Sequence, residues 1–225
     1  MKVSVIIPTL NESSGLANTI AKMRENSPCE ILVGDGGSDD GTLAIARQSG
    51  ARVIQSQRGR ANQMNAAANE AVGDLLLFLH ADTVLDPAGY RKMRETMRRK
   101  NLVGGAFGLQ LDSDKASLKV ISQLATWRSK YCNLVYGDQA IFVRKDIFRE
   151  MGGYPTLPIC EDLAFFRALQ KKGRTMVLRE KAHTSPRRWL SDGTAFTTLR
   201  NTVILAMFLL GFPPKIMARW YRAVR

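Results

Sequence analysis

The sequence predicts an α/β fold, with a Rossmann-like, mostly parallel sheet, helices on both faces and a helical tail at the carboxyl end. Two observations lead to this class. Apolar, β-branched runs alternate with segments of helical periodicity in the first part of the chain, as in parallel strands joined by crossover helices. Glycine-rich or acidic loops follow the second and the fourth of these runs. Because ligands bind at the carboxyl ends of parallel strands, function is expected at these loops.

The first four expected strands are short and apolar. They are Val3–Ile7, Glu30–Gly34, Ala51–Gln55 and Asp74–Leu79. The intervening segments 12–25 and 60–72 repeat apolar residues at helical spacing, which predicts two amphipathic crossover helices.

The alternation is looser after Pro87. Strands are expected at Gly104–Asp112 and Gln139–Lys145, and helices at Lys115–Lys130 and from Glu161 to a stop at Gly173. The chain contains no repeat, low-complexity tract or evident linker. We therefore expect one domain over residues 1–190, followed by a helical basic tail over 191–225.

The composition favours an anionic partner and an intracellular setting. Thirty-three Lys and Arg against twenty Asp and Glu give a formal charge of +13, which suits a phosphate, a nucleic acid or an anionic membrane. The three cysteines form no CxxC pair, so neither a disulfide framework nor a zinc site is indicated. The start of the chain lacks the pattern of a signal peptide, and the apolar run Val203–Phe212 is about half of the roughly 20 residues that span a bilayer. A cytoplasmic protein is expected, peripheral on the inner face of the membrane if the tail binds lipid.

The loop GDGGSDDGT follows the second strand, at residues 34–42. It is not the GxGxxG fingerprint, and Gly37 and Ala46 break the EF-hand pattern. Its acids could accept hydrogen bonds from a base or a ribose. The alternative is a turn before a helix that is capped by Asp39 or Asp40, and the loop taken alone favours this structural interpretation.

The fourth strand ends in His80, Ala81 and Asp82. His80 and Asp82 could help to bind a divalent cation that also contacts phosphates. The stretch HADTV is similar to the motif of haloacid dehalogenase phosphatases, but His80 stands where that chemistry needs a nucleophilic aspartate. Helix capping by Asp82 is less natural, because Asp86 already precedes Pro87 as a cap.

Two further motifs lie in the carboxyl half. Glu161 and Asp162 begin a helix, where acids either favourably oppose the helix dipole or serve chemistry. The stretch HTSPRRWL, residues 183–190, places two arginines beside a tryptophan. It is either a solvated corner or a site that neutralises a pyrophosphate, for which the arginine fork is well suited.

The order of these motifs resembles family 2 glycosyltransferases over residues 2–189. The motifs are IIPTLNE near the start, the acidic glycine loop, HAD, the ED pair and RRW, while GDQAIFVRK and PRRW are similar to a short bacterial subgroup of that family. The resemblance implies a GT-A fold, a UDP- or GDP-linked sugar donor, Mn²⁺ or Mg²⁺, and inverting transfer of the sugar to an acceptor hydroxyl.

The resemblance also implies roles for individual residues. Asp162 matches the catalytic base, and Asp82 the metal-binding acid, with His183 as a second metal ligand. Nucleotide and donor contacts fall on Pro8, Thr9, Asn11, Glu12, Asp35, Arg60, Asp82 and Arg188. The acceptor side is expected to include Asp138, Glu161 and Trp189.

Three positions depart from the family pattern. Gly36 replaces the second aspartate of the DDGS loop, which removes the residue that would help to choose between uridine and guanosine. His80 replaces the first acid of the DxD motif, so metal binding is expected to depend on Asp82. Ser185 replaces the glutamine of the QxxRW motif, which favours transfer of a single sugar over processive polymerisation.

Two readings compete with a transferase. A basic protein that binds nucleic acid or a membrane explains the charge but not the acids after the second and fourth strands, so nucleic acid is not favoured as a partner. A transferase fold that acts only as a scaffold is the other. The tail from Thr194 onward is expected to dock on an anionic membrane through its apolar run and its basic residues Lys215, Arg219, Arg222 and Arg225. The alternatives are a helix that closes the core of the domain or a homodimer contact.

Overall fold

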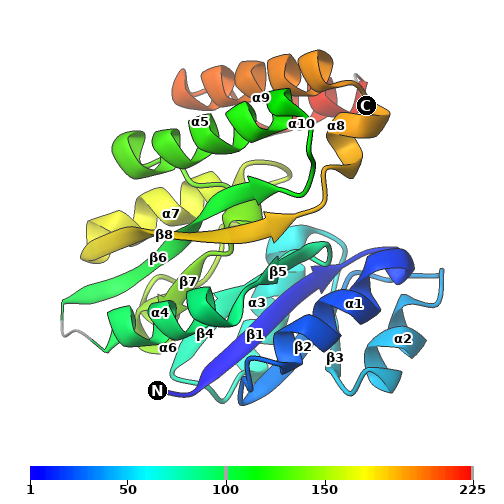
Figure 1. Ribbon diagram of the computed structural model, residues 1–225, viewed down its shortest axis with the longest axis vertical. Coiled ribbons are helices and arrows are strands. Elements are labelled where there is room, and N and C mark those ends of the chain that lie inside the picture. The colour runs from blue at the N-terminus through cyan, green and yellow to red at the C-terminus, as the bar shows by residue number, and fades with distance from the viewer. Residues whose placement is uncertain (99–100, 224–225) are drawn as a thin grey trace.

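A computed structural model describes residues 1–98 and 101–223 and confirms the α/β class. One eight-stranded sheet has the order β3-β2-β1-β4-β7-β6-β8-β5 (Figure 1). The strands are β1 Val3–Thr9, β2 Glu30–Asp35, β3 Arg52–Gln55, β4 Leu75–Phe78, β5 Thr83–Leu85, β6 Leu102–Leu111, β7 Phe142–Arg144 and β8 Arg174–Thr184.

Helices cover both faces of the sheet, because each has one apolar side. The helices are α1 Ser13–Arg24, α2 Thr42–Gln48, α3 Arg60–Glu70, α4 Pro87–Met97, α5 Ala116–Cys132, α6 Lys145–Glu150, α7 Glu161–Lys172, α8 Arg187–Ser191, α9 Thr194–Leu209 and α10 Pro214–Ala223, with a short 3₁₀ turn η1 at Gly137–Gln139. Residues of α1, α2 and α4 share one core cluster with the sheet. Residues of α3, α6 and α7 form the cluster on the opposite face.

The first four strands form the parallel half of the sheet. β1 pairs in parallel with β2 and β4, and β2 pairs in parallel with β3. All residues of β1 and β4 are buried, as the apolar runs predict. Thr9 stands opposite Asp35 in the register, so the loops after β1 and β2 leave the sheet side by side.

The second half of the sheet is mixed. β7 pairs antiparallel with both β4 and β6, and β6 pairs in parallel with the long strand β8. The sequence did not lead us to expect β8 or the short edge strand β5. The two pair antiparallel and oppose Thr83 to Thr184, which brings the segment after Asp82 next to the segment before Arg188.

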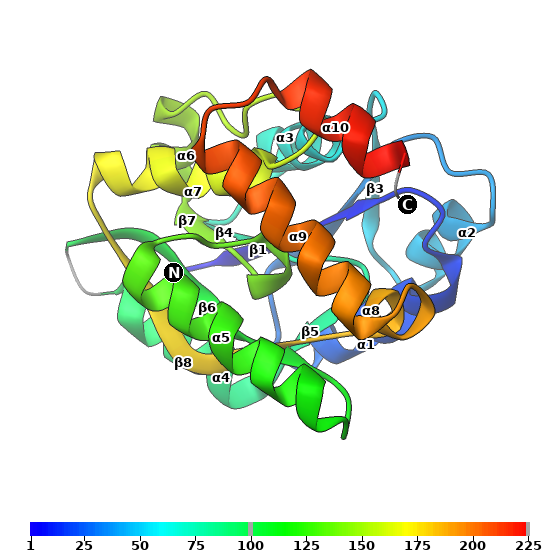
Figure 2. The ribbon, with the colours of Figure 1, turned by 90° about the horizontal axis from the view of Figure 1, so that it is seen from above.

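The tail packs on the domain. Ile204 of α9 and Met217 of α10 are buried in a cluster with Cys160 and Leu163, at the start of α7. Figure 2 shows α9 crossing the upper side of the molecule and α10 lying toward α3. Within the described part of the chain, no helix is long and apolar enough to cross a membrane. The expected basic residue Arg225 and the side chain of Arg222 lie outside the described residues.

A buried arginine fixes the tail. Arg200 on α9 is 2% exposed and forms an ion pair of 3.2 Å with Asp192. Its guanidinium carbon also lies 4.9 Å from the ring centroid of Tyr221 on α10 and 5.5 Å from that of Phe196. The ion pair joins α9 to the turn that precedes it, and removing one partner of such a pair is costly. The contact with the ring of Tyr221 joins α9 to α10.

Candidate active site

The loops after β1 and β2 are tied into one frame by Asp35. Its carboxylate is fully buried and accepts hydrogen bonds from the amides of Gly37 at 2.8 Å and Ser38 at 2.9 Å, and from the hydroxyl of Thr9 at 3.2 Å. Burial opposes ionisation, yet the hydrogen bonds from Ser38, Gly37 and Thr9 lower the pKa of Asp35 below its ordinary value. Asp35 is therefore an ionised residue that orders the loop.

Asn11 connects the same two loops from the other side. It adopts a left-handed conformation with φ of 56°, and its side-chain oxygen accepts a hydrogen bond from the amide of Asp39 at 3.0 Å. Asp40 accepts hydrogen bonds from the amides of Ser13 and Thr42, both at 3.1 Å. The helix cap that the sequence indicates at Asp39 or Asp40 is thus a bridge between loops, because Gly41 occupies the N-cap position of α2.

Gln63 on α3 explains the glycine at position 36, and the sequence alone did not identify it. Its side-chain amide donates a hydrogen bond to the carbonyl of Thr9. A Cβ atom on Gly36 would lie 2.7 Å from Nε2 of Gln63. A Cβ atom on Gly34 would lie 2.3 Å from the backbone carbonyl oxygen of Gln63. Gln63 therefore occupies the space into which an aspartate at position 36 would extend.

Asp162 and Glu161 form the acidic centre of the site. They begin α7 and are 8% and 4% exposed. Oδ2 of Asp162 accepts a hydrogen bond of 2.6 Å from the amide of Gly137, and Oδ1 accepts one of 2.8 Å from the amide of Leu163. Burial, followed by the charge of Glu161, raises the pKa of Asp162 from 3.8 to about 7, against the opposing charge of Arg60. This carboxyl can take up a proton near neutral pH.

Arg60 pairs with the second acid. Nη1 of Arg60 lies 3.2 Å from Oε1 of Glu161, and the Glu161 side chain is only 5% exposed. The Arg60 side chain itself is 39% exposed, so part of it remains available to solvent. Tyr221 of α10 lies near enough to influence the pKa of Arg60, which places the tail beside this pair.

His80 faces the same point as Asp162. A Cβ atom on Gly137 would lie 2.7 Å from Nε2 of His80 and 3.3 Å from Oδ2 of Asp162, so the glycine separates the two side chains. Burial, then the positive charges of Arg60 and Arg188, hold the pKa of His80 well below its ordinary value. The imidazole is therefore neutral at neutral pH, where the family pattern has a carboxylate.

Asp138 on η1 is half-buried, and it lies near enough to Asp82 to feel the charge of that residue. Burial raises its pKa, and the charge of Asp82 adds to the effect while those of Arg128 and Arg188 oppose it. Among the described residues, Oδ1 of Asp138 has no hydrogen-bond partner. The carbonyl of Asp138 accepts a hydrogen bond of 3.2 Å from Thr184, which anchors η1 to β8. An unpaired buried oxygen beside a second carboxylate suits a bound cation.

Asp82 and Asp138 are the carboxylates that could hold a divalent metal. In the described residues, no group of three or more His, Cys, Asp and Glu side chains is arranged to hold a metal. Mg²⁺ and Mn²⁺ commonly use only one or two protein carboxylates and take other ligands from phosphates and water. Asp82 and Asp138 supply that chemistry, so the residues present fit a metal that is shared with a ligand.

His183 is placed elsewhere than the resemblance implies. Its Nδ1 lies 3.0 Å from Oδ1 of Asp112, and its Nε2 lies 3.2 Å from Oδ2 of Asp86. Successive residues of a strand point to opposite faces, and the neighbouring Thr184 points toward Asp138. His183 therefore lies on the other face of β8, with both ring nitrogens engaged, and the structure does not bring it to Asp82.

The three residues of the RRW stretch lie in different surroundings. Arg188 lies near enough to His80 and Asp138 to affect both pKa values. Arg187, the other arginine of the pair that the sequence indicates, forms an ion pair of 3.3 Å with Glu12. Trp189 is half-buried and packs against the small apolar cluster between β6 and α5.

The comparisons with known proteins identify the family. The family model described as Glycosyl transferase family 2 matches residues 4–152. Glycosyltransferase AglJ of Haloferax volcanii is 31% identical over 97 residues, which cover 42% of this chain and 32% of AglJ. This chain spans only part of the length of such relatives: in four of them, AglJ included, the matched stretch covers between 23% and 62% of the relative's own length.

Two solved structures share the fold. The mannosyltransferase PcManGT from Pyrobaculum calidifontis, in complex with GDP-Man and Mn²⁺, gives a TM-score of 0.72 at 16% identity, covering 99% of this chain and 68% of that chain. TarS 1–349 of S. aureus, in complex with UDP-GlcNAc, gives 0.63 at 18% identity, covering 82% and 58%. The chain therefore belongs to glycosyltransferase family 2 and has a GT-A fold.

Proposed function

We propose that the protein is an inverting glycosyltransferase that moves one sugar from a nucleotide-sugar donor to an acceptor hydroxyl. One observation carries the proposal. Asp162 is a buried carboxyl with a pKa of about 7, positioned by the amides of Gly137 and Leu163. It shares its surroundings with Arg60 and with neutral His80, at the edge where ligands of parallel sheets bind.

Asp162 serves as the general base. The acceptor oxygen attacks the anomeric carbon from the side opposite the nucleotide, and its proton passes to the carboxylate of Asp162. The bond from the anomeric carbon to the diphosphate oxygen breaks, and the nucleoside diphosphate leaves with the electron pair. A base whose pKa lies near the working pH combines a high ionised fraction with a useful affinity for the proton.

The departing diphosphate needs positive charge. Arg188 is the residue proposed to bind it directly, because its charge already reaches both His80 and Asp138. Asp82 and Asp138 would hold Mn²⁺ or Mg²⁺ together with phosphate oxygens of the donor, and a metal bound there supplies further positive charge to the leaving group. Arg60 acts through Glu161 as a positioning residue.

The nucleoside is proposed to lie against the frame made by Thr9, Asn11 and Asp35. The hydrogen bonds of Asp35 are already made, so this carboxylate shapes the loop, while exposed Asn11 and Asp39 present polar groups at its surface. PcManGT and TarS bind a guanosine and a uridine donor respectively. Both UDP- and GDP-linked sugars are therefore the donors to test.

A donor panel tests the proposal. The free energy of unfolding should be measured with UDP-, GDP- and dTDP-sugars, each with Mn²⁺, with Mg²⁺ and with EDTA. A ligand that binds only the folded state raises it by about 2.7 kcal/mol at a hundredfold excess over Kd. We expect one nucleotide class to stabilise the protein in the presence of metal, followed by slow hydrolysis of the matching sugar donor. If no nucleotide stabilises the protein at millimolar concentration, the proposal fails.

A further inference from the structure

The outward side of α5 carries an apolar stripe where a surface helix normally carries polar residues. Val120, Leu124, Trp127 and Tyr131 follow the spacing of one helical face, and they are 51%, 60%, 57% and 64% exposed. The buried residues of α5, such as Leu118 and Ala125, lie on the opposite side of the helix and pack on β6. A scattered exposed apolar residue is ordinary, but a continuous stripe along about three turns indicates a binding surface.

The outward side of α9 repeats this arrangement. Leu199, Val203, Ala206 and Leu210 have the same spacing along the helix, and Leu199 and Leu210 are 64% and 76% exposed. Arg200 is the one charged residue of α9 and is buried, so this side of the helix presents no charge to solvent.

Helices α5 and α9, which carry the two stripes, lie on the same side of the molecule. Figure 2, seen from above, shows α5 and α9 both toward the viewer and running roughly parallel, and Figure 1 shows both in the upper layer. We name this surface the α5–α9 face and define it by six exposed residues: Val120, Leu124, Trp127, Tyr131, Leu199 and Leu210.

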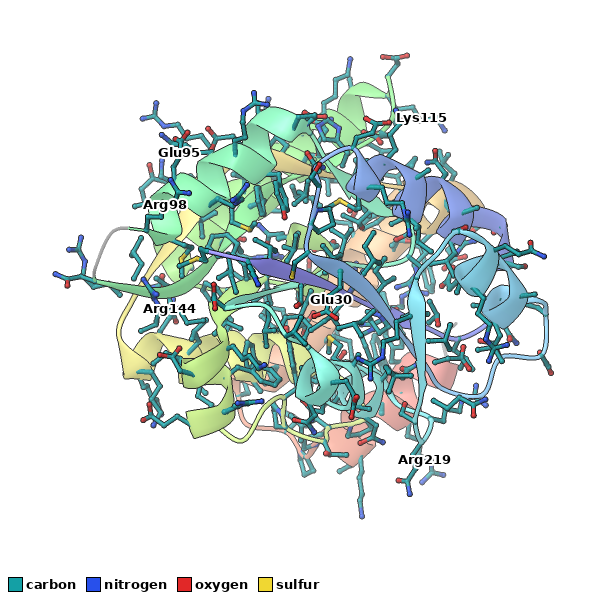
Figure 3. All side chains as sticks on the ribbon, turned by 90° about the horizontal axis from the view of Figure 1, so that it is seen from below. Glu30, Glu95, Arg98, Lys115, Arg144 and Arg219 are labelled. Atoms are coloured by element: carbon teal, nitrogen blue, oxygen red, sulfur yellow. The ribbon has the colours of Figure 1, made fainter. Side chains whose placement is uncertain are left out.

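Basic residues border the α5–α9 face, and one exposed acid, Asp114, lies at the start of α5, where it pairs with Lys119 at 3.6 Å. The segments 115–137 and 193–225, which contain α5 and the tail, include no Asp or Glu. Exposed Lys115 and Lys130 flank the stripe of α5, and exposed Lys215 and Arg219 follow α9. Figure 3 shows Lys115 and Arg219 extending outward at the edge of the molecule. The sequence predicts a docking surface on the tail alone. In the structure the tail is one part of a larger surface that also includes α5.

We propose that the α5–α9 face docks the protein on the surface of an anionic lipid bilayer. Apolar side chains that include a tryptophan and a tyrosine, with a basic border, suit the interface between headgroups and acyl chains. The basic border is attracted to anionic headgroups. A second copy bound through the same face would bring the two basic borders together, so its charge is less complementary than that of a lipid surface. The proposal does not depend on the transfer chemistry.

Flotation with vesicles tests the proposal. The full chain is mixed at low salt with vesicles of phosphatidylcholine and phosphatidylglycerol, or of phosphatidylcholine alone. The variants are Leu124→Gln with Leu199→Gln, and Val72→Gln as the matched control. Val72 is 65% exposed and lies beside Glu30 at the start of β2, a region that Figure 1 shows below α5 and α9. All three positions are exposed, so circular dichroism should show an unchanged fold.

The wild type should float with anionic vesicles and bind less as salt increases. The double variant should lose about tenfold or more in partition coefficient for each leucine replaced, while Val72→Gln binds as the wild type does. A wild type that stays at the bottom with anionic vesicles overturns the proposal, as does a double variant that floats equally well. Analytical ultracentrifugation without lipid covers the remaining case: a dimer that the double variant abolishes, with no flotation, assigns the face to a second copy.

Discussion

Replacing Asp162 with asparagine should make the protein more stable and much less active. The carboxyl is 8% exposed, and its pKa is raised from 3.8 to about 7. A raised carboxyl pKa means that the folded state keeps a proton that the unfolded chain releases. The free energy of unfolding therefore falls as the pH rises from 3.8 to about 7, and the loss is complete above that window.

The size of the effect follows from the shift. About three pKa units at about 1.4 kcal/mol each amount to roughly 4 kcal/mol of destabilisation above neutral pH. Asparagine has a single side-chain acceptor for the two amides of Gly137 and Leu163, which costs about 1–3 kcal/mol for the amide left unsatisfied. We expect the free energy of unfolding of Asp162→Asn to exceed that of the wild type by about 1–3 kcal/mol at about pH 8. At about pH 5 this difference should be about 3 kcal/mol smaller.

Urea denaturation of both proteins at these two pH values measures the gain. Donor affinity should be close to that of the wild type, while turnover should fall by roughly a hundredfold to ten-thousandfold, because the proton acceptor is gone. Glu161→Gln is the comparison variant. It keeps the carboxyl of Asp162 but removes the neighbouring charge that helps to raise its pKa, so turnover should fall less than in Asp162→Asn. A variant that is equally destabilised at both pH values, with turnover intact, would refute both the buried charge and the catalytic role.

Three further outcomes follow from the geometry of the site. Asp82→Asn should abolish the metal-dependent part of nucleotide affinity in calorimetry with Mn²⁺ and leave the melting temperature unchanged; equal affinity with and without the substitution would remove Asp82 from the metal site. Gly137→Ala should lower turnover at least tenfold, because its Cβ would lie 2.7 Å from Nε2 of His80 and 3.3 Å from Oδ2 of Asp162. Full turnover in this variant would show that the site accommodates the added methyl group without loss of activity. His183→Gln should leave the Mn²⁺ concentration for half-maximal activity unchanged, since Asp86 and Asp112 already engage the imidazole; a large increase in that concentration would restore the metal role first expected for His183.

The buried half of the sheet could be predicted from the sequence because its pattern is local. Strands β1 and β4 are buried throughout and mostly apolar, and polar residues follow them, so their boundaries and their ligand-binding edge follow from a few neighbouring positions. Strand β8 could not be found in this way. Its burial pattern is irregular, with only Leu178, Ala182 and Thr184 buried, and it includes charged Arg179, Glu180 and Lys181. Its pairing with β6 and β5 makes it a strand.

The residues of the candidate site also differ in whether the sequence could predict their positions. The places of Asp82 between β4 and β5 and of Asp162 at the start of α7 could be predicted from the order of the motifs. The position of His183 could not, because its partners Asp86 and Asp112 are remote in sequence and lie on the other face of β8. Gln63 was missed for a related reason, since its amide matters only through the glycines of the β2 loop, which pack against it.

The stereochemistry of donor cleavage tests the central claim most directly. With the donor found in the panel, proton NMR should follow the anomeric signal of the sugar released to water in the absence of an acceptor. Base-assisted attack from the side opposite the nucleotide predicts that an α-linked donor first yields the β-anomer, and that Asp162→Asn abolishes this signal. Initial release of the α-anomer, or an unchanged rate in Asp162→Asn, would contradict the account.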